Sequence, residues 1–151
     1  MTSITTRPKP SRSARGGGHC PRLLLAEDDE DLRAFLADRF RAVGFEVIEA
    51  EDGTSVVECL AESIVNQDNS ENLDLIVSDI RMPGFTAFDV LRSARRALAN
   101  IPVILITGFG DRRTHERAHA LGASAVFDKP LDVDELVVAA CGLLSRAGLE
   151  E

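Results

Sequence analysis

The sequence predicts an α/β fold in which five parallel strands form one sheet with helices on both faces. From residue 22 onward, short apolar runs alternate with amphipathic segments, which is the pattern of successive β-then-α units. The chain has 151 residues, of which 44% are hydrophobic, enough for one core but not two. One domain is therefore expected over residues 22–147.

Five segments are predicted to be strands, and most of them are rich in Val, Ile and Leu: residues 22–26, 45–50, 73–78, 102–107 and 124–127. The second strand alternates apolar and acidic side chains, as an edge strand does, whereas the first, third and fourth are almost entirely apolar, as central strands are. This favours the strand order 2-1-3-4-5. In such a sheet a ligand site forms beyond the carboxyl ends of the first and third strands, at the topological switch point.

Helices are predicted between the strands, where apolar residues recur at helical spacing. Their inward faces are expected to contain Leu32, Phe35, Leu36 and Phe40; Val57, Leu60, Ala61 and Ile64; Ala87, Leu91, Ala94 and Leu98; and Leu136, Ala140, Leu143 and Leu144. Residues 111–121 predict a weaker helix, in which only Ala118 and Leu121 are clearly inward.

The composition of the two chain ends predicts tails, and the net charge of the rest argues against one class of partner. Residues 1–21 lack an apolar period and are rich in Ser, Thr, Pro, Gly and Arg, so a disordered basic tail is expected there, with a short tail at residues 148–151. Residues 1–22 carry five basic and no acidic residues, which leaves 12 basic and 25 acidic residues beyond them, a net charge of −13. This argues against nucleic-acid binding by the folded part.

No apolar run suits a membrane span or a secretory signal, so a cytoplasmic protein is expected. The three cysteines, Cys20, Cys59 and Cys141, lack the spacing of a metal site. Cys59 and Cys141 are expected to be buried thiols on helices.

Acidic side chains follow the first strand and end the third. Residues 27–31 are five consecutive acids, of which the last three suit a helix N-terminus. Glu27 and Asp28 come directly after the strand, so they are expected to point into the crevice, and Asp79 emerges beside Asp28. Three carboxylates in one place repel one another unless they bind a hard cation, for which Mg²⁺ is the natural candidate.

A hydroxyl and an ammonium are predicted at the same edge, because Thr107 ends the fourth strand and Lys129 follows the fifth. The chemistry that fits this set is phosphoryl transfer. Asp79 would attack phosphorus as a carboxylate nucleophile, and Mg²⁺ would be held by Asp28 and Asp79 directly and by Glu27 through water. Thr107 would hydrogen-bond one phosphoryl oxygen, and Lys129 would pair with another.

Four segments resemble the signature blocks of the receiver domains of two-component response regulators: LLLAEDDEDLR, LDLIVSDIRMPG, VILITGFGD and VFDKPLD. Together with the spacing of the elements, the resemblance covers residues 22–147. It implies a flavodoxin-like fold and places the family's acidic pair on Glu27 and Asp28, its phosphoacceptor on Asp79, its hydroxyl residue on Thr107 and its lysine on Lys129.

The resemblance implies further features of the site and its partners. The backbone carbonyl of Arg81 falls where the family supplies another Mg²⁺ ligand. Val126 stands where the family usually has a Tyr or Phe that acts as a rotamer switch, and Phe127 is predicted on the opposite face of the strand. The implied protein is a phosphoacceptor rather than an enzyme. It would receive its phosphoryl group from a sensor histidine kinase or a histidine phosphotransfer protein and dock onto a downstream protein, with a phosphorylation-dependent homodimer left open.

Two other classes of protein compete with this interpretation. A haloacid-dehalogenase-like Mg²⁺-dependent phosphatase uses similar residues but carries a second Asp two positions after the nucleophile, where this chain has Arg81. Hydrolysis is therefore expected to be slow. A flavin-binding protein is disfavoured because the chain has no Trp or Tyr to stack on the cofactor.

Overall fold

The structure is a computed structural model that describes residues 20–65, 73–82, 85–89, 91–92, 101–108 and 110–149. The basic tail predicted for residues 1–21 lies outside these residues, apart from Cys20 and Pro21. The Cys20 thiol donates to the carbonyl of Gly44 (Sγ–O 3.1 Å), and the carbonyl of Pro21 accepts from the N–H of Glu46 at 2.8 Å. The chain is therefore tied to the sheet from residue 20 onward.

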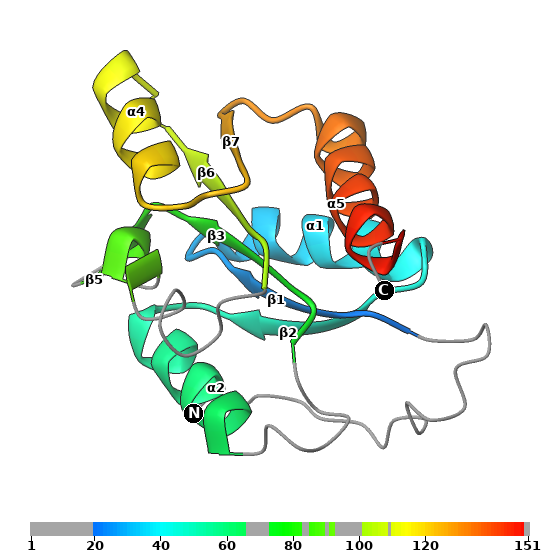
Figure 1. Cartoon of the computed structure of the whole chain (residues 1–151). Coiled ribbons are helices and arrows are strands. Elements are labelled where there is room, and N and C mark those ends of the chain that lie inside the picture. The colour runs from blue at the N-terminus through cyan, green and yellow to red at the C-terminus, as the bar shows by residue number, and fades with distance from the viewer. Residues whose placement is uncertain are drawn as a thin grey trace.

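Five parallel strands form the central sheet (Figure 1): β1 (Arg22–Ala26), β2 (Glu46–Ala50), β3 (Leu75–Asp79), β6 (Val103–Thr107) and β7 (Ala125–Asp128). Their order is β2-β1-β3-β6-β7, which confirms the predicted order 2-1-3-4-5. All residues of β1, β3 and β6 are buried, whereas the edge strand β2 keeps Glu46 and Glu49 half-buried. The predicted strand bounds are correct to within two residues.

A two-stranded antiparallel ladder follows β3 and was not predicted. It pairs β4 (Arg81–Met82) with β5 (Phe85–Thr86). The N–H of Ile80 donates to the carbonyl of Ile106 at 2.8 Å, and the carbonyl of Ile80 accepts from the N–H of Ala87 at 2.8 Å. These bonds hold the segment after Asp79 against β6, and strands of two residues are too short to give a periodic sequence signal.

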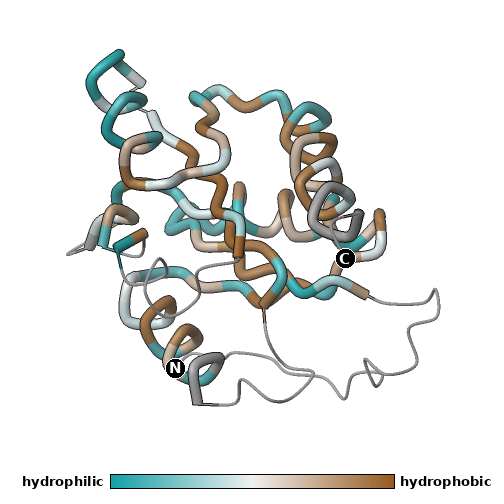
Figure 2. Tube along the Cα trace, in the orientation of Figure 1, coloured by the Kyte–Doolittle hydropathy of each residue, from teal (hydrophilic) through white to brown (hydrophobic). Residues whose placement is uncertain are grey.

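The helices cover both faces of the sheet (Figure 1). On one face α1 (Glu30–Ala42) and α5 (Val133–Leu149) contribute to a core that also contains Leu23 and Leu25 of β1. On the other, α2 (Gly53–Val65), the helical residues 87–89 and 91–92, and α4 (Arg112–Ala120) contribute to a core that also contains Leu24 and Ala26. Successive strand residues thus feed two separate cores, and Figure 2 shows the hydrophobic strands between them. The helix α5 reaches Leu149, so the tail predicted from residue 148 begins inside it.

Aspartate side chains begin four helices in the same way. Asp29, Asp52, Asp111 and Asp132 each accept a hydrogen bond from the backbone N–H three residues later, which satisfies a donor that the helix leaves unpaired. At Asp111 this bond, from Thr114, lowers the pKa of the carboxyl. The acids predicted to start a helix after β1 therefore do so, with Asp29 as the cap.

The predicted inward faces of α1 and α2 are wrong in part. Phe35 and Val57 are 52% and 54% exposed, and Ala61 is exposed. The residues that α1 buries are Leu36, Ala37 and Phe40, and those that α2 buries include Val56, Cys59 and Leu60. In both helices an apolar residue adjoins the buried stripe, and periodicity alone could not decide which of the two edges faces the sheet.

Other packing predictions have mixed outcomes. Leu136 and Ala140 are buried and Leu143 and Leu144 half-buried, as predicted for the last helix. Ala87 and Leu91 are buried, while Ala94, Leu98 and the side chain of Ile64 lie outside the described residues. Cys59 is buried as predicted, but Cys141 is exposed; it lies one turn after Val137, at the edge of the stripe that α5 buries.

The helix α4 is attached mainly by polar contacts. Ala118 is its only buried residue, which agrees with the weak helix predicted there, and Figure 2 shows α4 as largely hydrophilic. The guanidinium of Arg117 lies 4.4 Å from the ring centroid of Phe88, within the range of a cation–π contact. The Nε2 atom of His115 lies 2.9 Å from Oδ1 of Asp128 at the end of β7. No described helix is long and apolar enough to span a membrane.

Candidate functional site

The carboxyl ends of four strands bring the predicted site residues to one edge of the sheet. Glu27 and Asp28 follow β1, Asp79 ends β3, Thr107 ends β6, and Lys129 follows β7. Register pairs Asp79 with Ile106 and Thr107 with Asp128, so the strand ends are level. Glu27, Asp79 and Thr107 are buried, whereas Asp28 is exposed and can face solvent.

The three carboxylates lie close together. One ligand oxygen from each of Glu27, Asp28 and Asp79 can be chosen so that all lie within 4.8 Å of one another, and no other group of this kind occurs among the described residues. Such proximity concentrates negative charge in a place where burial reduces screening. The donor set, all carboxylate oxygens, is one that a hard divalent cation prefers.

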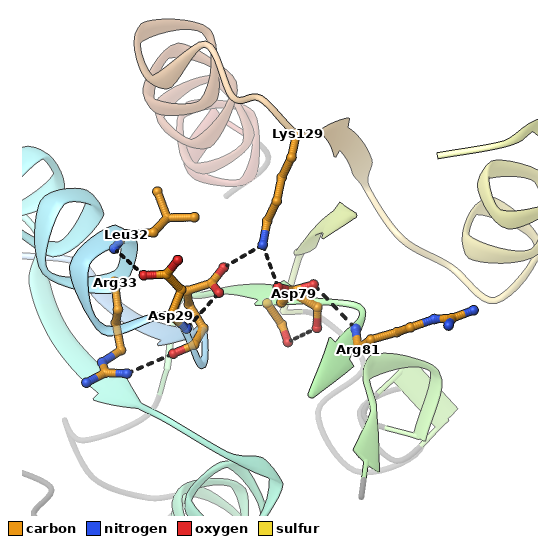
Figure 3. Close-up of polar contacts among 8 residues, drawn as sticks. Asp29, Leu32, Arg33, Asp79, Arg81 and Lys129 are labelled. Atoms are coloured by element: carbon orange, nitrogen blue, oxygen red, sulfur yellow. Dashed lines mark hydrogen bonds and ion pairs between the residues drawn. The ribbon is translucent and has the colours of Figure 1, made fainter. Parts of the chain in front are cut away.

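Lys129 supplies the positive charge at this edge. Its Nζ lies 2.8 Å from Oδ2 of Asp79 and 3.3 Å from Oε1 of Glu27, and Figure 3 shows the ammonium reaching Asp79 from the β7 side. Burial by itself lowers the pKa of Lys129, but the hydrogen bond and charge of Asp79, with the charge of Glu27, raise that pKa above its ordinary value. The lysine is therefore held as a cation beside Asp79.

Glu27 is an unusual carboxyl because it is both buried and incompletely bonded. Its Oε2 accepts the N–H of Asp29 at 3.0 Å, but Oε1 is buried with no hydrogen bond, since the contact with Lys129 lacks hydrogen-bond geometry. Burial raises the pKa of Glu27 from 4.5 to about 7, and Asp79 adds to the rise, while Asp29 and Lys129 oppose it. Among the described residues, Oε1 therefore has only the Lys129 ammonium, at 3.3 Å, as a charge partner. Three carboxylates within reach of one another beside this ammonium leave negative charge unpaired, and buried charges are paired or coordinate metals, so these residues fit a divalent metal.

Each carboxylate oxygen of Asp79 accepts a hydrogen bond from a different partner. Oδ2 receives the Lys129 ammonium, and Oδ1 receives the backbone N–H of Arg81 at the long distance of 3.4 Å. Its side chain is 8% exposed. The carboxylate that Lys129 holds at 2.8 Å is thus the one at the end of the central strand β3, and the backbone of Arg81 lies beside it (Figure 3).

The backbones of Thr107 and Lys129 are joined by a hydrogen bond from the lysine N–H to the threonine carbonyl, 2.8 Å long. The backbone at the end of β6 is therefore bonded directly to the residue that carries the ammonium. Next to it on β7, Val126 packs against the core that contains α2 and α4, and Phe127 packs against the core that contains α1 and α5. The predicted placement of these two side chains on opposite faces is confirmed.

Comparison with known proteins identifies the family. Residues 23–140 match the family model described as the response regulator receiver domain. The chain belongs to this family. The receiver domain is similar to the transcriptional activator protein PfeR of Pseudomonas aeruginosa, with 35% identity over 130 residues, which are 86% of this chain and 40% of PfeR.

Two further similarities support the membership of the receiver domain. The transcriptional regulatory protein PdtaR of Mycobacterium tuberculosis is 36% identical over 122 residues, 78% of this chain and 54% of that protein. The chain thus spans about half the length, or less, of these two regulators. The receiver domain of the Francisella response regulator 1452 superposes with a TM-score of 0.74 at 25% identity, covering 84% of this chain and 98% of that one.

Some residues that organise the receiver site were missed by sequence reasoning. Arg33 donates to the carbonyl of Glu27 at 2.9 Å and contacts Glu49. The backbone at Gly110 leaves room for Asp128, since a Cβ there would lie 1.6 Å from Oδ1 of Asp128. The sequence signal that could have identified Arg33 is its position four residues after the cap of α1. A side chain in the first turn of a helix points back toward the N-terminus, here toward the end of β1.

Proposed function

We propose that the chain is a phosphorelay acceptor in which Asp79 takes a phosphoryl group with the help of Mg²⁺. The observation that carries the proposal is the position of Asp79: it belongs to the acidic cluster and also contacts Lys129 at 2.8 Å. A nucleophile next to both a cation site and a fixed ammonium is what phosphoryl transfer requires. We place the functional domain at residues 22–147.

The proposed step begins with attack by an Asp79 oxygen on phosphorus. The bond between phosphorus and the donor atom breaks as the bond to Asp79 forms, and the donor keeps the electron pair. Lys129 would leave its contact with the Asp79 oxygen and pair with a phosphoryl oxygen. The Thr107 hydroxyl would donate to another, and the backbone connection between Thr107 and Lys129 would couple their movements.

Asp28 and Asp79 would hold Mg²⁺ directly, Glu27 would hold it through water, and the backbone carbonyl of Arg81 would be a further ligand. When bound, Mg²⁺ would neutralise charge on the phosphoryl oxygens. The exposure of Asp28 supports a site that opens to solvent and to the donor. Three carboxylates, with ligand oxygens within 4.8 Å of one another and, in the described part of the chain, only the Lys129 ammonium beside them, support a further cation at this place.

The proposed partners follow from the proposed chemistry. A phosphohistidine on a sensor kinase or a histidine phosphotransfer protein is the proposed donor, and the phosphorylated domain would change its contact with a downstream protein or a second copy of itself. Hydrolysis of the aspartyl-phosphate would be slow, because no acid or base stands two residues beyond Asp79. The match to the receiver family gives the phosphatase alternative no support.

The test is labelling with a small phosphodonor. Wild-type protein incubated with acetyl phosphate and Mg²⁺ should gain one phosphoryl group that is stable in acid and lost in base. Asp79→Asn should gain none, while Asp128→Asn, which removes another carboxylate at a strand end, should be labelled normally. Labelling of Asp79→Asn at the wild-type level would refute the assignment of the acceptor.

A further inference from the structure

The turn that carries the acidic pair is tied to the rest of the fold through Glu27. The N–H of Glu27 donates to the carbonyl of Ala50 at the end of β2, at 3.1 Å. The Oε2 atom of Glu27 accepts from Asp29 at 3.0 Å. The remaining backbone group, the carbonyl of Glu27, accepts from Nη1 of Arg33 at 2.9 Å. This carbonyl belongs to the peptide that leads into Asp28, so whatever fixes it also fixes the start of Asp28.

Arg33 is itself held in place from the neighbouring strand. Its side chain is only 13% exposed, and its Nε lies 3.3 Å from Oε1 of Glu49 on β2. The other carboxylate oxygen of Glu49 lies 3.2 Å from Nη2 of Arg41. The guanidinium of Arg33 thus connects β2 with the acidic turn, and Figure 3 shows it reaching a carbonyl beside Asp29.

The charge of Arg33 and its position have opposite consequences for a cation at the acidic cluster. A guanidinium near the site repels a divalent cation, so its charge alone weakens metal binding. Its planar fork, however, can donate to Glu49 and to the Glu27 carbonyl at once, which a lysine ammonium cannot match in geometry. The half-buried Arg33 guanidinium can therefore favour a cation site only if the benefit of holding the Glu27 backbone in place outweighs its repulsion of the cation.

We propose that Arg33 is a positioning residue that orients Glu27 and Asp28 for metal binding, and that Glu49 is its anchor. The proposal rests on the proposed function, since it takes the acidic cluster to be the metal site. Outer-shell partners of this kind typically change metal affinity by roughly 10- to 100-fold when they are removed. The geometry assigns to Arg33 a part in the phosphoryl-transfer site although it contacts neither the metal nor the acceptor.

The experiment compares three variants with the wild type. Arg33→Met removes the charge and the bridge, Arg33→Lys keeps the charge without the fork, and Glu49→Gln weakens the anchor while keeping the shape. The readouts are Mg²⁺ affinity by titration and the amide exchange rate of Asp29 in metal-free protein. We expect roughly tenfold weaker Mg²⁺ binding for Arg33→Met and a smaller loss for the other two. Exchange at Asp29 should accelerate in all three, because Glu27 is no longer fixed.

Arg41→Met is the matched control, because Arg41 also contacts Glu49 but makes no contact with Glu27. It should leave both readouts within twofold of the wild type. Equal or tighter Mg²⁺ binding by Arg33→Met, with unchanged Asp29 exchange, would overturn the proposal. If wild-type protein bound no Mg²⁺, the proposed function would fail, and the Asp29 exchange rates would still decide whether Arg33 orders the turn.

Discussion

Replacing Glu27 with glutamine should stabilise the metal-free protein at alkaline pH and leave its stability almost unchanged near pH 4. The substitution keeps the shape of the side chain and removes a carboxylate that is 1% exposed. Burial raises the pKa of Glu27 from 4.5 to about 7, so the folded protein holds this proton more tightly than the unfolded chain does. Between these two values the folded state binds more protons, and its stability falls as the pH rises.

The size of the effect follows from the two pKa values. Each pH unit between 4.5 and about 7 corresponds to about 1.4 kcal/mol, so the ionised Glu27 carboxylate costs the fold roughly 3–4 kcal/mol above pH 7. Below pH 4.5 the group is protonated in both states and costs nothing. Because glutamine resembles the protonated acid at every pH, the variant should be more stable than the wild type by this amount at pH 8 and by almost none at pH 4.

Urea unfolding of both proteins in the presence of EDTA at pH 4, 6 and 8 measures this difference, and subtracting the two curves removes the contribution of titrating groups that do not interact with Glu27. Excess Mg²⁺ at pH 8 should shrink or reverse the difference, because the cation stabilises the ionised carboxylate of the wild type. A difference that is constant from pH 4 to pH 8, or a variant less stable than the wild type at pH 8, would refute the reasoning.

Three further predictions concern the metal ligand, the α4 attachment and the output. Asp28→Ala should weaken Mg²⁺ binding by more than the roughly tenfold loss typical of outer-shell partners. Its thermal stability should equal or exceed that of the wild type, because repulsion between carboxylates is relieved. An unchanged Mg²⁺ affinity in a titration would contradict this prediction. Gly110→Ala should displace the exposed Asp128 carboxylate from His115 and destabilise the fold by no more than about 1 kcal/mol, because its Cβ would collide only with side-chain ends that can move. Gly142→Ala, where a Cβ meets nothing within 4 Å, should stabilise it by about 0.5–1 kcal/mol, and urea unfolding compares the two. Beryllofluoride with Mg²⁺ should change amide exchange chiefly across residues 107–121 and β7, and Thr107→Ala should remove much of that change; equal changes across β2 would show that the signal leaves by another face.

The sheet and the site were predictable from the sequence for one shared reason. Burial on both sides makes β1, β3 and β6 continuous apolar runs, and the residue at which each run stops is the residue that enters the crevice. The positions of Asp79 and Thr107 at the ends of these runs therefore mark them as candidate site residues. Glu27 and Asp28 are marked in the same way, because they lie between the end of β1 and the cap of α1. The strand order then places these residues at one edge without any knowledge of their side-chain contacts.

The features that could not be predicted depend on side-chain direction across elements. Periodicity shows that α1 has an apolar stripe but not its precise centre, so Phe35 was placed inside although it is 52% exposed. Contacts such as Arg33 with Glu49 join a helix to a strand 16 residues away, and both residues look like ordinary surface charges in the sequence. The space at Gly110 that admits Asp128 is visible only once β7 and the loop before α4 are placed together.

The attachment of α4 has a consequence for how temperature and salt act on it. The helix buries only Ala118, and its side-chain contacts with other described residues include Arg117 on the Phe88 ring and His115 beside Asp128. Of its own side chains, detachment would newly expose mainly that of Ala118, so the helix itself would contribute little to the change in heat capacity. Apolar contacts weaken on cooling, whereas contacts between charged and polar groups at the surface weaken as the ionic strength rises. Dissolved salt, more than cold, is therefore the variable that should loosen α4, while the core between the sheet and the helices α1 and α5 stays intact.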